Sequence, residues 1–197
     1  MAKTMKAPIA MKGAQLVDFK GRMLNHIEMI YRPGERSLVG KVFQALGCGV
    51  IETGGTYLLL PIGPGETDSL NNIAYASEVT KEQWAFEQEL AKQLKTNPAL
   101  SAAYKGYDQK FRKEPQLTTH FGIRYPSFAK LEAQLQHIRT GLPPEIRGRL
   151  EICSVFRPGD PGSLSNTIIQ AFVKTDVVVA GLLTLGQHIE LQAQQLE

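Results

Sequence analysis

Residues 24–33 read LNHIEMIYRP, and a related stretch, TTHFGIRYP, occupies residues 118–126. Both contain His-x-x-x-x-Tyr followed within two residues by Pro, with the histidines at His26 and His120. Self-similarity between distant parts of a chain is the sequence sign of a repeated structural unit. The recurrence predicts that the chain consists of two diverged copies of one module, each opening on a strand that carries a histidine.

The segments that follow each stretch come in the same order in both halves. A helical segment with apolar spacing comes first, at 37–46 and at 127–138, and a serine near the N-cap position opens each. A short strand, a longer β-rich run and a closing strand come next, at 48–52, 56–62 and 71–77 in the first half and at 150–155, 167–179 and 187–193 in the second. This order predicts an α+β fold built from two β-α-β-β-β modules.

The modules are predicted at 22–78 and 117–197, with a helical connection at 79–116 between them. The connection opens on TKEQ at 80–83, which has the form of a capping box, and Asn97-Pro98 is expected to end the helix that follows. An alternative starts the second module at Asn72, because the residues after it also read as strand and then helix. The later start is preferred, since only His120 begins a segment with enough strands behind it.

Composition and charge bound the class of protein. The chain of 197 residues is 43% apolar and 21% charged, with a formal net charge of +3, as in ordinary soluble globular proteins. Its Lys and Arg residues are spread rather than clustered, which argues against nucleic-acid binding. Cys48 and Cys153 suggest no disulfide framework. Segment 1–19 has no apolar stretch long enough for a signal peptide, and no run approaches the roughly 18 apolar residues of a membrane span. We therefore expect a cytoplasmic protein that binds neither nucleic acid nor membrane.

Strand alternation sorts the polar candidates onto single faces. His26 and Glu28 share one face of the first predicted strand, and His120 and Arg124 share the same face of its counterpart. Glu190 lies on the polar face of the closing strand. The opposite face of each strand is largely apolar and suited to packing under a helix. The polar faces therefore either line a site or form the solvated side of an antiparallel sheet.

These paired modules, with a histidine in each first strand and the closing sequence LGQHIELQ at 185–192, resemble the glyoxalase/bleomycin-resistance/extradiol-dioxygenase superfamily, also called vicinal oxygen chelate proteins. The resemblance covers roughly 24–78 and 118–193. It implies a curled, barrel-like cupped sheet with helices outside, enclosing a divalent metal and a small-molecule substrate. Members of this superfamily often pair modules across dimers, so a homodimer is an expected state.

The resemblance also implies a set of metal ligands. His26 and His120 stand at the first-strand positions, and Glu190 stands at the last-strand position of the second module. Ala74 occupies the matching place in the first module, where the lyase branch usually has a glutamate. The expected site therefore has two histidines and one carboxylate, as in the dioxygenase branch. Such a set suits Fe(II), and also Mn, Zn or Ni, and leaves positions open for substrate and water.

Two further residues are candidates for catalysis. Arg124 shares the His120 face and is expected to pair with a substrate carboxylate or phosphate, or else to form a salt bridge with Glu28 or Glu190. Glu28 is expected to act as a general base or to orient a histidine. The leading hypothesis is a metal-dependent dioxygenase, lyase or isomerase acting on a small oxygenated substrate. The alternative is a metal-free small-molecule binding or resistance protein of the same fold, in which the histidines are structural.

Overall fold

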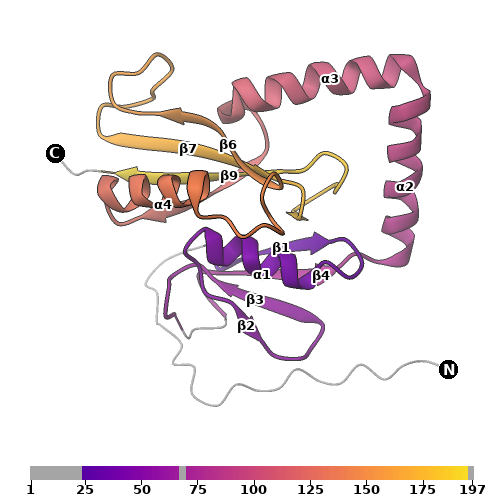
Figure 1. Cartoon of the computed structure of the whole chain (residues 1–197), viewed down its shortest axis with the longest axis horizontal. Helices are drawn as coiled ribbons and strands as arrows, with labels where there is room; N and C mark the ends of the chain where they lie inside the picture. The colour runs from indigo at the N-terminus through magenta and orange to yellow at the C-terminus, as the bar shows by residue number, and fades with distance from the viewer. Residues whose placement is uncertain (1–23, 67–69, 195–197) are drawn as a thin grey trace.

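The computed structural model describes residues 24–66 and 70–194 (Figure 1). Segment 1–19, on which the expectation about a signal peptide rests, and the outermost residues of both predicted modules lie outside these ranges. In chain order the elements are β1 (His26–Tyr31), α1 (Arg36–Ala45), β2 (Ile51–Glu52), β3 (Tyr57–Pro61), β4 (Ile73–Glu78), α2 (Lys81–Thr96), α3 (Pro98–Lys113), the 3₁₀ turn η1 (Pro115–Leu117), β5 (His120–Tyr125), α4 (Phe128–Thr140), β6 (Leu150–Phe156), β7 (Ile168–Thr175), β8 (Val178–Val179) and β9 (Gln187–Gln194).

The strands form two sheets with the same internal order. The first sheet runs β2-β3-β4-β1-β8 and the second runs β6-β7-β9-β5. In each, the first strand of the module lies parallel to the last, β1 beside β4 and β5 beside β9, while the remaining neighbours within the module are antiparallel. The predicted α+β class and the repeated strand order are therefore confirmed.

The short strand β8 belongs to the second half of the chain but pairs with the first sheet. Val178 and Val179 lie antiparallel to Tyr31 and Ile30 of β1. The sequence pattern at 167–179 predicted one continuous run, whereas the structure ends β7 at Thr175 and sends β8 across to the other module. β1 pairs with β4 along one edge, and β8 covers only the end of its other edge. The earlier part of that other edge, and the whole outer edge of β5, have no strand partner among the described residues. Neither sheet closes into a barrel within those residues.

Side-chain caps start most of the helices. The hydroxyl of Ser127 accepts a hydrogen bond from the Lys130 amide at 3.2 Å and opens α4, as predicted. Thr80 caps α2, and Asn97 caps α3, a second helix within the predicted helical connection. The expectation of a serine cap on α1 is wrong: the N-cap of α1 is Glu35, which makes no side-chain cap bond. Packing, rather than a cap, therefore fixes the start of α1.

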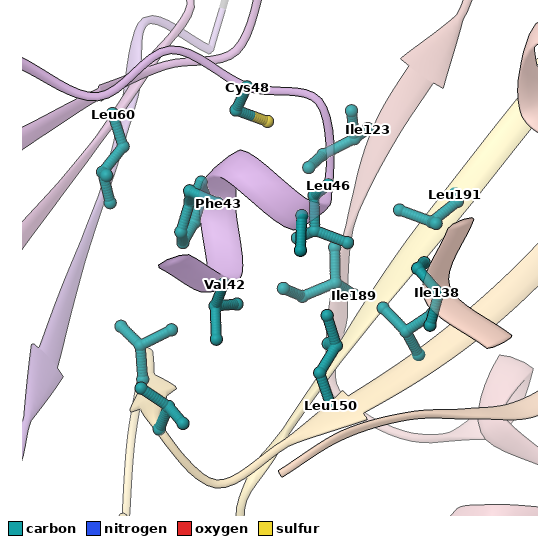
Figure 2. Close-up of a cluster of buried hydrophobic side chains, with 14 of the residues drawn as sticks. Val42, Phe43, Leu46, Cys48, Leu60, Ile123, Ile138, Leu150, Ile189 and Leu191 are labelled. Carbon is teal, nitrogen blue, oxygen red and sulfur yellow. The ribbon is translucent and has the colours of Figure 1, made fainter. Parts of the chain in front are cut away.

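The apolar core is continuous between the two modules. Figure 2 shows side chains of α1 between Leu60 of the first sheet and Ile123 and Ile189 of the second. All belong to one buried cluster. The Gln134 amide of α4 donates to the Ala45 carbonyl, and the Tyr125 hydroxyl donates to the Leu46 carbonyl, so backbone groups at the end of α1 are satisfied by the second module. Each fully buried side chain of this size contributes roughly 1.5–3 kcal/mol, so the shared core stabilises both modules.

Helices α2 and α3 form an arm that leaves the first module and returns over the second (Figure 1). The arm is tied down by Glu87, whose buried carboxylate accepts hydrogen bonds from the amides of Leu183 and Thr184 and from the Thr184 hydroxyl, at 2.6–3.0 Å. Farther along, the Phe111 ring of α3 stacks on His188 with ring centroids 3.7 Å apart. The arm therefore covers part of the polar face of the second sheet. None of the helices in the described ranges has the length and hydropathy needed to cross a bilayer.

Candidate functional site

A cavity of about 990 Å³ lies between the two modules. It is lined by the start of β1, the two residues after α1, residues 62–64 and 72–73 near the β3–β4 connection, the whole of β5, and Lys130 and Gln134 of α4. His26 and His120, the histidines of the two repeated strands, both line it. The unpaired edges of β1 and β5 thus border one space, and most of its wall is apolar. Cavities with apolar walls and a few convergent polar groups are the usual form of a small-molecule site.

His120 is held in one orientation by the backbone. Its Nδ1 lies 2.7 Å from the Thr118 carbonyl oxygen, and because a carbonyl only accepts hydrogen bonds, Nδ1 carries a proton. Its Nε2 lies 3.3 Å from Oε2 of Glu190. A neutral imidazole with this tautomer would turn a lone pair toward the carboxylate. The contact is therefore attractive only when a proton or a metal cation lies between the two atoms.

Glu190 is buried on β9 and has partners on both oxygens. Oε1 accepts hydrogen bonds from the side-chain amides of Gln170 at 2.8 Å and Gln192 at 3.3 Å, and Oε2 faces His120. The strand register explains this cluster, since Gln170 of β7 lies opposite Gln192 of β9. The two amide donors and the histidine fix the position of the carboxylate. The His120–Glu190 pair is accordingly a fixed cation-binding or proton-sharing unit at the side of the cavity.

The third predicted ligand is placed elsewhere in the cavity wall. His26 is exposed, its Nδ1 lies 2.9 Å from Oδ1 of Asn25, and its ring lies 5.4 Å from that of Tyr75. Within residues 24–66 and 70–194, no three or more His, Cys, Asp or Glu side chains are grouped closely enough to hold a metal ion. The structure thus brings together two members of the predicted set and leaves His26 apart. A three-ligand centre stays a prediction.

The two predicted catalytic residues differ in position. Glu28 does not line the cavity, and its carboxylate accepts a hydrogen bond from the Ser77 hydroxyl at 2.8 Å. Arg124 does line the cavity. Neither of the salt bridges considered for Arg124 forms: of the ion pairs made among the described residues, none involves it. Its guanidinium is therefore free to bind a ligand.

His188 lies next to this unit but does not line the cavity. The hydroxyl of Thr118 donates to the Pro115 carbonyl, so Nδ1 of His188, 3.2 Å away, donates to that hydroxyl. Burial lowers the pKa of His188 to about 4, with further lowering by the charge of Lys174 and by His120. Its Nε2 is buried without a hydrogen-bond partner. His188 is thus a neutral imidazole stacked under α3, and Thr118 orients both histidines.

Several residues of the site carried no strong signal in the sequence. Gln192 shares the strand face of Glu190 and was detectable by alternation alone. Gln170 could be found only from the β7–β9 register, which depends on the whole sheet. Thr118 acts through its backbone carbonyl, which every residue type has, and through its hydroxyl, which several other polar side chains could replace. Lys130 stands in the first turn of α4, where a lysine is ordinarily solvent-exposed.

No family model matches the chain, and no curated protein or solved structure matches it. The function has to be inferred from the geometry of the site.

Proposed function

We propose that this protein binds a small organic molecule in the cavity between its two modules, as a metal-free binding protein of the kind seen in the superfamily it resembles. The observation that carries the proposal is the convergence of β1 and β5, the equivalent first strands, on one space of about 990 Å³. That volume falls at the upper end of the range typical of small-molecule sites, roughly 300–1,000 Å³. Polar groups in the wall, among them His26, His120 and Arg124, would set the orientation of the ligand.

The proposal includes a finer description of the fold. The two sheets would form a cupped, barrel-like surface with the cavity at the junction of β1 and β5. The repeated strand order, the unpaired edges of these two strands and the shared core support this arrangement. In it, the cavity is a consequence of the repeat, because each module contributes the same strand to the junction.

The test is a substitution that fills the cavity without straining the backbone. Gly122 lines the cavity, and the three atoms nearest to a Cβ at this position belong to the side chain and backbone of Glu190, at ordinary contact distances of 3.8–3.9 Å. Gly122→Val should therefore fold and should abolish binding of small molecules found in an NMR screen. Gly181→Val is the matched control, because a Cβ there meets nothing within 4 Å. Ligands that bind both variants as well as the unmodified protein would show that the cavity is not the site.

A second function, a divalent-metal-dependent dioxygenase, lyase or isomerase, is favoured by the His120–Glu190 pair. Two ligands of one metal ion at about 2.1 Å are roughly 3.0–3.4 Å apart in octahedral or tetrahedral geometry, and the observed separation is 3.3 Å. Metal-binding histidines usually donate their other N–H to a carbonyl or carboxylate, as His120 does to Thr118. A bound Fe, Mn, Ni or Zn ion would supply a Lewis acid for an oxygenated substrate.

Metal analysis separates the two functions. Protein purified without chelator and then offered Fe, Mn, Ni or Zn should hold about one equivalent if the second function is correct, and His120→Ala should lose it. His137→Ala is the matched control, since His137 is exposed on α4 and away from the cavity wall. Less than about a tenth of an equivalent in the unmodified protein would exclude the metalloenzyme and leave the binding function standing.

A further inference from the structure

The charged side chains that line the cavity are all positively charged. Among its described lining residues, Arg124 and Lys130 are charged and none is Asp or Glu. Two partly buried arginines elsewhere are neutralised, since Arg36 pairs with Glu52 and Arg149 pairs with both Glu35 and Asp176. Arg124 and Lys130 are both exposed. Arg124 makes no such pair among the described residues, and neither does Lys130. The space between the modules is therefore suited to an anion.

The rest of the wall is largely apolar. Phe121, Ile123 and Tyr125 alternate with His120 and Arg124 along β5 and so lie on the other face of the strand. They line the cavity at the unpaired edge of β5 together with Leu46, the residue after α1. An anion with no apolar part would leave this surface in water, whereas an amphipathic anion would cover it. Burial of apolar surface contributes roughly 25 cal/mol per Å², so the body of the ligand would supply much of the affinity. The wall thus favours an apolar molecule with one charged end.

The strand β5 also gives a length scale. His120 and Arg124 lie four residues apart on the same face of β5, and both line the cavity. At about 3.3 Å per residue, their positions along the strand differ by about 13 Å. An extended chain of roughly ten carbon atoms spans this distance, given carbon–carbon bonds of about 1.5 Å in a zigzag.

We infer that the ligand is an apolar monocarboxylate of about ten carbon atoms, with its carboxylate held by Arg124 and Lys130 and its body extending along β5 toward His120. This inference rests on the proposed binding function and names the class of molecule that the same cavity takes. The planar guanidinium of Arg124 matches a carboxylate through two parallel hydrogen bonds. Lys130 would add a point charge from the first turn of α4.

Calorimetric titration with decanoate tests the inference, with butanoate and decylammonium as comparison probes. Decanoate should bind at one molecule per chain, butanoate at least about tenfold more weakly, and decylammonium not at all. Arg124→Gln should weaken decanoate binding about tenfold. Arg139→Gln is the matched control, because Arg139 is an exposed arginine on α4 that does not line this cavity, and it should change the affinity less than about twofold. Lys130→Gln should have a smaller effect than Arg124→Gln.

The possible results distinguish the carboxylate class of the ligand from the binding function of the cavity. Equal loss in the Arg124 and Arg139 variants, or binding of decylammonium as tight as that of decanoate, would overturn the carboxylate class while leaving the cavity as a site. Amide shifts at Phe121–Tyr125 report whether either probe enters the cavity. If a screen that includes acids, bases and neutral molecules finds no compound that shifts these amides, the proposed binding function itself fails. Unfolding curves of each variant show whether the fold is retained.

Discussion

Acidification should destabilise the fold through His188. This side chain is fully buried and its pKa is lowered from 6.5 to about 4, first by burial and then by Lys174 of β7, His120 of β5 and Arg112 of α3. Asp108 of α3 acts in the opposite direction but does not offset them. Below its ordinary pKa, His188 is protonated in the unfolded chain and still neutral in the folded one.

The sign and size of the effect follow from proton linkage. The unfolded state binds one more proton than the folded state between pH 6.5 and about 4, so stability falls as the pH falls through this window. The full difference of 2.5 pKa units (6.5 minus 4) corresponds to about 3 kcal/mol. About 2 kcal/mol of it should be lost between about pH 7.5 and about pH 5.

Urea unfolding at a series of pH values measures this loss. Carboxylates also contribute to acid destabilisation, so the comparison that matters is between the unmodified protein and His188→Asn. The variant should be less stable near neutral pH, since it leaves a gap beneath Phe111, but its stability should fall about 2 kcal/mol less between about pH 7.5 and about pH 5. His137→Asn, at an exposed histidine, should leave the pH dependence unchanged. Parallel curves for the unmodified protein and His188→Asn would refute the reasoning.

Three further predictions concern stability, measured as the free energy of unfolding in urea. Leu135→Ala removes a fully buried side chain and should cost about 2–5 kcal/mol. Its control, Leu164→Ala, changes a side chain that is 72% exposed and should cost less than about 0.5 kcal/mol. Similar losses in the two variants would place Leu135 outside the core. Glu87→Ala leaves three donors of Leu183 and Thr184 without their acceptor and should cost about 2–4 kcal/mol. Its control, Glu82→Ala, changes an exposed side chain and should be nearly neutral. An unchanged stability of the Glu87 variant would show that this carboxylate does not hold the arm in place. Arg149→Ala breaks bonds to carboxylates of both modules and should cost about 1 kcal/mol, less in high salt because the side chain is partly exposed; a loss that salt leaves unchanged would mean that packing, not charge, is responsible.

The repeat could be predicted from the sequence because its signals are local. Helical and strand periodicity identify the apolar face of each helix and strand in a module. When these faces are buried and the first and last strands lie parallel, few strand orders are possible. The boundaries of β9 and α4 agree with the predicted segments to within two residues at each end. Strand alternation also placed Glu190 and His120 on polar faces, and the β5–β9 pairing then brings them together.

The remaining features depend on contacts between distant segments. The transfer of β8 to β1 follows from a break at 176–177 in a run that is β-rich throughout, so no local pattern distinguishes it from a longer β7. The covering of the second sheet by α3 depends on the stacking of Phe111 on His188, and alternation gives the face of His188 but not its partner. The separation of His26 from the His120–Glu190 pair is likewise set by how the two sheets meet. Periodicity within a module contains no information about that angle.

The central claim is that one ligand contacts both modules in the cavity between β1 and β5. Methyl-edited nuclear Overhauser spectra of the protein with decanoate test it most directly, because Ile27 of the first module and Ile123 of the second both line the cavity. We predict cross-peaks from the ligand chain to the methyl groups of both isoleucines, and their disappearance in Gly122→Val. Cross-peaks to neither isoleucine, or to residues of one module only, would contradict the account.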